Sequence, residues 1–160
     1  MEIIIIFLAK YLPLFVIAGA VLVGALSEPK TRKALFILAI IAIPIAYGVG
    51  ELTGFLIENP RPFVVEGVAP LIPHVPNNGF PSTHALIAMT VASVVFVHNR
   101  KAGYVLFALA LLVGLGRVMA LVHNPIDVLG STVIALAVTW CATVASKRIQ
   151  SKHTYEETTA

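Results

Sequence analysis

Five apolar segments, each close to the length of a membrane-crossing helix, limit what this chain can fold into. A helix needs about 20 mostly apolar residues to cross the hydrocarbon of a bilayer. The segments are Tyr11–Leu26 (whose helix could begin near Ile3), Ala34–Ile57, Ser82–Val97, Ala102–Val122 and Ile126–Ser146. Mean hydropathy is +0.92 and 12% of the residues are charged, about half the charged share of soluble domains. We therefore expect an all-α integral membrane helix bundle of about five transmembrane helices.

No repeat or linker divides the chain. We expect a single transmembrane domain over residues 1–150, followed by a polar tail, 151–160, that is disordered. The N-terminal run lacks the cationic start of a secretory signal, so we expect it to be retained.

The basic residues predict which way the bundle faces. Eight of the eleven Lys and Arg residues follow the first, third or fifth segment: Lys30, Arg32, Lys33, Arg100, Lys101, Lys147, Arg148 and Lys152. The positive-inside rule assigns these ends to the cytoplasm, which makes 151–160 a cytoplasmic tail. The loop 58–81 and the turn around Asn124 then face outward from a plasma (inner) membrane. The residue types most typical of chemistry gather at that outer end.

Arg117, His123 and Asp127 are the most unusual residues there. Charged groups at membrane depth cost roughly 2.5–3.5 kcal/mol on insertion scales, so they usually mark function. Asn124-Pro125 is expected to end one helix and begin the next. Asp127 then lies in the first turn of the last helix, where a carboxylate is favoured. Asp127 could accept from one imidazole nitrogen and leave the other lone pair free for attack. Taken alone, the pattern has a structural alternative, an Asp–His pair that fixes a tight turn.

Two further segments lie at the same predicted end. Pro60 and Pro62 restrict the backbone around Arg61, whose planar guanidinium suits phosphate oxygens. In Pro81-Ser82-Thr83-His84, Ser82 is a candidate N-cap, and a helix N-terminus offers free N–H groups to an anion. For each segment alone a structural alternative stays open: an interfacial arginine for the first, and a capped helix with an interfacial histidine for the second. Combined with the first group, they predict a phosphoryl-transfer pocket in which arginines neutralise charge without a metal.

In order and spacing, the three segments resemble the type-2 phosphatidic acid phosphatase superfamily. That family's pattern is Lys-x6-Arg-Pro, then Pro-Ser-x-His, then Ser/Gly-Arg-x5-His-x3-Asp. The matching residues are Arg61-Pro62, Pro81-Ser82-Thr83-His84 and Gly116-Arg117 with His123 and Asp127. The resemblance covers most of residues 50–130. Residues 61–85 also look like bacitracin-resistance-type undecaprenyl pyrophosphate phosphatases.

The resemblance implies a role for each site residue. His123 would be the nucleophile and form a phosphohistidine, Asp127 would orient it, and His84 would protonate the leaving oxygen. The phosphoryl oxygens would be bound by Arg61, Arg117, Ser82 and Thr83. The substrate would be a membrane lipid: a polyprenyl (undecaprenyl) pyrophosphate or a similar lipid phosphate. The reaction would use no cofactor or metal, and the protein would bind no nucleic acid.

The chain departs from the family at two points. The family's lysine falls at Gly54, and the family core commonly has six spans. Other functions stay open: a phosphatidate, phosphatidylglycerophosphate or lipid A phosphatase, a lipid phosphotransferase, or a non-catalytic membrane scaffold. His74 could contact a second phosphate or be an ordinary loop histidine, and Glu51 faces either the bundle interior or the outer interface. The oligomeric state is open as well.

Overall fold

The computed structural model describes the backbone of residues 1–159 and the side chains of residues 1–148. Regular structure in this part of the chain is helical, with one isolated β-bridge between Pro60 and Asn78. The elements are α1 (Glu2–Ile6), the π-helical η1 (Phe7–Tyr11), α2 (Leu12–Leu26), α3 (Pro29–Leu56), α4 (Pro62–Glu66), α5 (Thr83–His98), α6 (Arg100–Met119) and α7 (Pro125–Thr159).

The all-α membrane bundle is confirmed. Four helical stretches are long and apolar enough to cross a membrane, and α5 is a shorter apolar helix: the long ones are Glu2–Leu26, Pro29–Leu56, Arg100–Met119 and Pro125–Arg148. The first stretch begins at Glu2, because η1 carries the helix past Lys10 without a break. Helix α7 runs to Thr159 and so enters the segment 151–160; the disorder expected of that tail stays a prediction.

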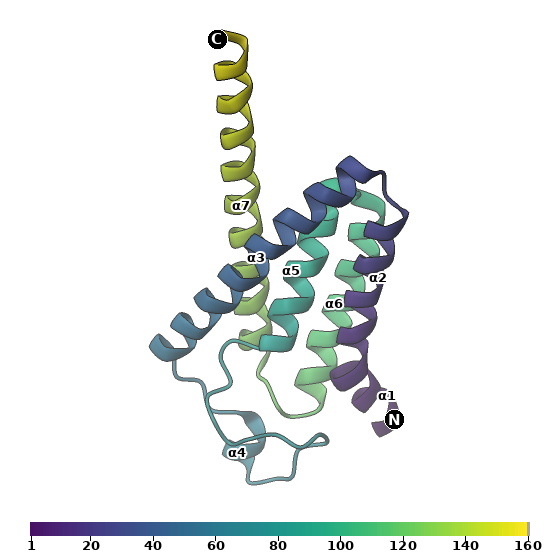
Figure 1. The fold of residues 1–160 in the computed structure, drawn as a ribbon. Helices are drawn as coiled ribbons and strands as arrows, with labels where there is room; N and C mark the ends of the chain where they lie inside the picture. The colour runs from purple at the N-terminus through teal and green to yellow at the C-terminus, as the bar shows by residue number, and fades with distance from the viewer. Residues whose placement is uncertain (160) are drawn as a thin grey trace.

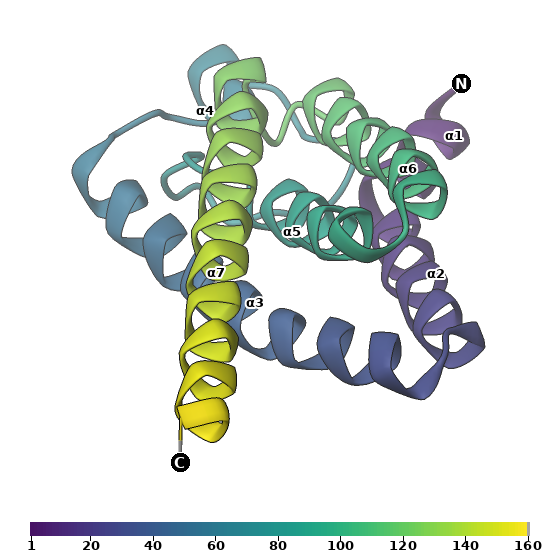
Figure 2. The same ribbon diagram turned by 90° about the horizontal axis from the view of Figure 1, so that it is seen from above.

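Helix α5 is the centre of the bundle. Most of its residues between Ala85 and Val95 are buried, as expected of a helix that is apolar all round. Helices α6, α7, α3 and α2 surround it when the molecule is viewed from above (Figure 2). The hydroxyls of Thr90 and Ser93 donate to carbonyl oxygens one turn earlier, so these buried polar groups are satisfied. The first turn of α5 is thereby held firmly at one end of the bundle.

The connections between helices lie at the two opposite ends of the bundle (Figure 1). Helix α4, the loop after it and the α6–α7 turn lie together at one end, and the α2–α3 and α5–α6 connections lie at the other. The loop end is tied to α6 through the backbone: Phe63 N–H donates to Leu121 O at 3.1 Å and Leu71 N–H to Ala120 O at 3.3 Å. Leu121 has a φ of 62°, an unusual left-handed conformation for a leucine. These contacts bring the Arg61 segment to the Arg117–Asp127 segment, and the N–H of Ser82, which donates to Asp127 O at 3.3 Å, joins the third segment to them.

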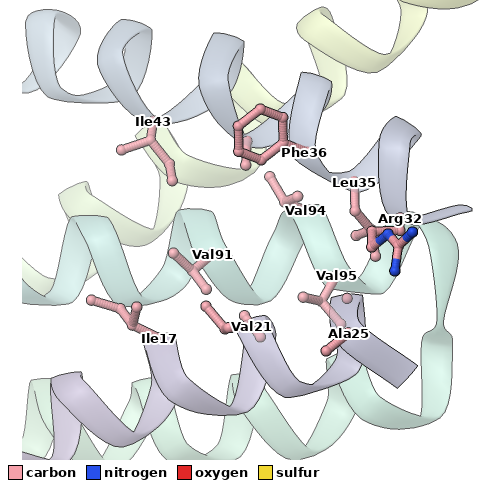
Figure 3. A pocket seen from close by; sticks show the side chains of 13 residues that line it. Ile17, Val21, Ala25, Arg32, Leu35, Phe36, Ile43, Val91, Val94 and Val95 are labelled. Atoms are coloured by element: carbon pink, nitrogen blue, oxygen red, sulfur yellow. The ribbon is translucent and has the colours of Figure 1, made fainter. Parts of the chain in front are cut away.

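An apolar groove of about 460 Å³ lies between α2, α3 and α5 (Figure 3). Its walls are mostly aliphatic, with Ile17, Val91 and Ile43 toward one end and Arg32 at the other. Arg32 belongs to the first turn of α3, at the end of the bundle away from α4. The groove can hold an apolar chain, but its lining provides no group for acid–base or nucleophilic chemistry.

Candidate active site

Asn78 joins the end of α3 to the loop that leads into α5. Its side-chain Nδ2 donates to Gly54 O at 2.6 Å and to Ile57 O at 2.8 Å. Its Oδ1 accepts from Asn59 N at 2.9 Å and from Phe80 N at 3.2 Å. Donors and acceptors of this one amide are therefore all engaged in holding the loop in place.

Arg61 lies inside this loop framework and is only 5% exposed. Its Nη1 donates to Val122 O at 2.6 Å, its Nη2 to Asn78 O at 3.1 Å and its Nε to Asn77 Oδ1 at 3.0 Å. Nη1 also lies 3.2 Å from His123 Nε2. Most of the five N–H donors of Arg61 are thus used to hold the guanidinium beside His123.

Arg117 extends from the last turn of α6 and is 3% exposed. Its neighbour Gly116 lets η1 pack directly on α6, because a Cβ there would lie 2.6 Å from Leu8 Cβ. Arg117 Nη1 makes one long contact of 3.5 Å to Ala9 O in that π-helical turn. Its Nε is buried without a hydrogen-bond partner among the described residues.

The other end of the Arg117 guanidinium faces two imidazoles. Nη2 lies 2.9 Å from His74 Nε2 and 3.4 Å from His123 Nε2. Within the described side chains, neither Arg117 nor Arg61 forms an ion pair with a carboxylate. A buried charge without a counter-ion is costly, so the two guanidinium groups form a ready site for an anion.

The hydrogen bonds of His123 determine its tautomer. Its Nδ1 faces two groups that only accept, Gly79 O at 2.9 Å and Asp127 Oδ2 at 3.3 Å. Its Nε2 faces arginine N–H groups, which only donate. The proton therefore sits on Nδ1, and the Nε2 lone pair points at the two guanidinium groups. Burial lowers the pKa of His123 below its ordinary 6.5, as do the charges of Arg117 and Arg61, while Asp127 opposes the shift.

Asp127 is fully buried and held by more than His123. Asn59 Nδ2 donates to its Oδ1 at 2.6 Å, and Asn124 N donates to its Oδ2 at 2.8 Å. Its backbone oxygen accepts from Ser131 Oγ at 2.7 Å. The carboxylate is thereby fixed from the α3–α4 connection as well as from its own helix.

Ser82 occupies the N-cap position of α5 but does not cap the helix through its side chain. Its Oγ is buried and lacks a hydrogen-bond partner among the described residues, which leaves the hydroxyl free for a ligand oxygen. Its amide N–H already donates to Asp127 O at 3.3 Å. Of the two donors of Ser82, the hydroxyl is therefore the one still available to an anion, because the amide is already engaged.

His84 and Thr83 both belong to the first turn of α5. His84 is exposed, and the charges of Arg117, His123 and Arg61 act on its ring. Thr83 lines a pocket of about 410 Å³. Arg61, Asn77 and Asn78 line the same pocket, and so do Glu51 and other residues near the end of α3. Glu51 is exposed in this pocket, so of its two expected positions it has the one outside the bundle interior.

Gly54 also lines the second pocket, and its lack of a side chain has a steric cause. A Cβ on Gly54 would lie 2.7 Å from the backbone oxygen of Phe80, closer than atoms tolerate without backbone movement. Asn78 approaches the Gly54 carbonyl from the same side. A lysine at this position does not fit the observed loop.

The structure brings all seven predicted site residues to one end of the bundle, and their chemical roles stay predictions. Sequence reasoning missed the loop amides: Asn59 on Asp127, Asn77 on Arg61, and Asn78 on α3. Asn77-Asn78-Gly79 has only the composition of a turn. The sequence offered one sign of this close packing, the glycine at position 79. In the structure, a Cβ on Gly79 would lie 2.9 Å from both Asn59 O and Asp127 Oδ2.

Comparison with known proteins gives a family and several relatives. The family model described as PAP2 superfamily matches residues 32–151. Bacitracin transport permease protein BcrC of Bacillus licheniformis is 33% identical over 156 residues, covering 94% of this chain and 76% of that protein. Undecaprenyl-diphosphatase BcrC of Bacillus subtilis (strain 168) is 41% identical over 80 residues, which are 50% of this chain and 42% of that protein. The solved structure of Aquifex aeolicus LpxE aligns with a TM-score of 0.64 at 25% identity, covering 87% of this chain and 92% of that one.

Proposed function

Because this chain belongs to the PAP2 superfamily and is a membrane lipid phosphate phosphatase, we propose that it hydrolyses a polyprenyl diphosphate through a phosphohistidine on His123. Undecaprenyl diphosphate is the first choice of substrate, because a relative at 41% identity is named an undecaprenyl-diphosphatase. That relative is matched over less than half its length, so the substrate belongs to the proposal.

One observation carries the proposal. The buried guanidinium of Arg117 has no carboxylate partner among the described residues, and its Nη2 lies 3.4 Å from His123 Nε2. That nitrogen carries the lone pair of the ring, because Nδ1 holds the proton. The lone pair becomes available for attack once phosphate oxygens take over the arginine N–H groups that face it. A phosphoryl group between the two would be bound by a cation and faced by a nucleophile, which is the arrangement that phosphoryl transfer needs.

In the first step, the lone pair of His123 Nε2 attacks the terminal phosphorus of the lipid diphosphate. The bond from phosphorus to the bridging oxygen breaks, and its electron pair stays on the lipid phosphate, which takes a proton from His84. Asp127 stabilises the positive charge that develops on His123, because its carboxylate faces Nδ1 at 3.3 Å. Arg61, Arg117, the Ser82 hydroxyl and Thr83 bind the phosphoryl oxygens.

In the second step, water attacks the phosphohistidine. His84, now neutral, accepts a proton from this water, and general acid–base help of this kind is worth typically 10²–10⁴-fold. The N–P bond breaks, its electron pair returns to His123 Nε2, and inorganic phosphate leaves. The cycle uses only groups of this chain and needs no cofactor.

We further propose that the site faces the extracytoplasmic side of the plasma (inner) membrane. The N-terminal ends of α3 and α6 carry Lys30, Arg32, Lys33, Arg100 and Lys101, and these helix ends lie opposite the site (Figure 1). Under the positive-inside rule, that basic end is cytoplasmic. A labelling experiment on intact cells with a membrane-impermeant thiol reagent would test this on cysteines introduced at Val75 and Lys101; the proposal expects labelling at Val75 alone.

A lipid phosphate panel tests the function. We expect the purified protein in detergent to release phosphate fastest from a polyprenyl diphosphate, more slowly from phosphatidate, phosphatidylglycerophosphate and lipid A. Equal rates, or no release from the prenyl substrate, would remove the first choice. His123→Ala should abolish release, whereas His98→Ala, which changes a histidine near Lys147 at the opposite end, should not. Equal slow rates for wild type and His123→Ala would favour a scaffold, and phosphate recovered on an acceptor lipid would favour a transferase.

A further inference from the structure

We propose that His74 is a third ligand of the phosphoryl group, neutral in the empty site and positively charged once the anion binds. The proposal rests on the proposed function for the identity of the anion. It goes beyond that function by assigning a binding role and a proton to a loop histidine that the mechanism above does not use.

The position of His74 puts its ring beside any anion that binds between Arg117 and His123. Its ring lies edge-on to that of His123, with centroids 5.9 Å apart and an interplanar angle of 70°. Its Nε2 is 2.9 Å from Arg117 Nη2, the same nitrogen that faces the His123 lone pair at 3.4 Å. His74 thus occupies the edge of the guanidinium that a phosphoryl group on His123 must also use.

In the empty site His74 acts as a hydrogen-bond acceptor. An arginine N–H only donates, so the short contact requires a lone pair on His74 Nε2. Near neutral pH, the oxygens of a phosphoryl group mostly accept hydrogen bonds. When they take over the Arg117 donors, His74 Nε2 keeps a partner only by becoming a donor itself. The other neutral tautomer could also donate from Nε2, but the negative charge of the phosphoryl group favours the ring that carries a second proton and a positive charge. The same nitrogen therefore changes from acceptor to donor as the anion enters.

The charges around His74 explain why this change needs the anion. Four groups act on it: Arg61 before α4, Arg117 on α6, His123 in the α6–α7 turn and His84 on α5. Burial and these groups lower the pKa of His74 from 6.5 to about 4, and none of them is a carboxylate. A bound phosphoryl dianion adds the missing negative charge and raises the pKa again.

Binding and protonation are then linked. The pKa of His74 is higher in the complex than in the empty site, so between these two values binding takes up a proton. Across that window the affinity for the anion falls as pH rises, by at most about tenfold per pH unit from this one group. A histidine that only positioned Arg117 would give no such dependence.

The decisive variant is His74→Gln. The Oε1 of glutamine can still accept from Arg117, but the side chain cannot take a proton. His74→Lys carries a permanent charge, and His98→Gln is the matched histidine control at the opposite end. The probe is inorganic phosphate, whose affinity is read from the rise in Tm that it causes at a series of pH values. The protonation state of free phosphate is the same for every variant at a given pH. Comparing the variants at each pH therefore removes its contribution to the measured affinity.

We expect His74→Gln to bind phosphate about tenfold more weakly than wild type in mildly acidic buffer and to approach wild type as pH rises. His74→Lys should remove much of the pH dependence, and His98→Gln should match wild type. In ¹⁵N NMR of wild type at neutral pH, the His74 ring should be neutral without phosphate and protonated with it. Unchanged affinity in His74→Gln, an equal loss at every pH, or a ring that stays neutral would overturn the proposal. Lipid phosphate release by wild type is assayed beside these, so failure of the proposed function would be seen separately.

Discussion

Asn78 donates a 2.6 Å hydrogen bond from its side-chain amide to the carbonyl oxygen of Gly54, at the position where the resemblance predicts a lysine. The contact depends on the close approach of the loop to α3, and that approach leaves no room for a Cβ on Gly54. The absence of the lysine is thus compatible with a well-formed site, because the space is taken by the loop that positions Arg61.

Gly54→Lys should therefore harm the protein rather than improve it. A side chain here must displace the Phe80 carbonyl, and overpacking of this kind costs about 1–3 kcal/mol. We expect a lower Tm and no gain in phosphate release. Gly48→Ala, on the same helix with nothing within 4 Å of the new Cβ, is the control and should change neither. A Gly54→Lys protein that is both stable and more active would contradict the steric explanation.

Asn59 should be a positioning residue for Asp127, because its amide donates to the carboxylate at 2.6 Å. In Asn59→Asp two carboxylates face each other, so we expect kcat to fall by at least about tenfold, from the loss of a charge-assisted hydrogen bond and like-charge repulsion. Asn99→Asp at the other end keeps its cap of α6 and should behave as wild type. A wild-type kcat for Asn59→Asp would exclude this role.

His123 should remain neutral and nucleophilic at mildly acidic pH. Its pKa lies below 6.5 chiefly because it is buried, with Arg117 and Arg61 adding to the shift. The neutral form exists above the pKa, so activity should persist as pH falls until that lowered value is reached. ¹⁵N NMR should find the proton on Nδ1. Arg61→Gln removes one of the cations and should move the acid limb of the His123 titration upward; a downward shift would be inconsistent with this account.

Arg117→Met should separate stability from activity. A buried charge that has no carboxylate partner among the described residues is costly, so its replacement by an apolar side chain of similar size should be neutral or stabilising. We expect an unchanged or higher Tm without ligand, no lipid phosphate release, and no rise of Tm with added phosphate. Arg100→Met, on the exposed first turn of α6, should keep the response to phosphate. A strongly destabilised Arg117→Met would mean that the guanidinium serves the fold.

Chelation should leave the rate unchanged. The proposed chemistry places the neutralising charge on arginine side chains, so EDTA should have no effect and vanadate, which resembles the transferred phosphoryl group, should inhibit. The measurement is phosphate release after dialysis against EDTA, with and without added Mg²⁺. Loss of activity on chelation, followed by its return when Mg²⁺ is added, would contradict the metal-free mechanism.

The amino-acid sequence alone was enough to predict the bundle and the residues that meet in it. Long apolar runs can only be helices in a membrane, because every backbone polar group must be satisfied within the segment. The spacing from Arg117 to Asp127 placed a cation, an imidazole and a carboxylate around one helix break. Both inferences depend on local chemistry and on spacing along the chain, which a sequence displays directly.

The tertiary structure decided how the predicted residues are held and which of their atoms are free. Asn59, Asn78 and Gly79 act through contacts between segments distant in sequence, and turn-forming residues give no sign of such partners. The free Ser82 hydroxyl, the tautomer of His123 and the steric reason for Gly54 likewise follow from distances across the loop. Sequence determined which groups gather at this end of the membrane, and only the packed loop decided which donors and lone pairs remain for a phosphate.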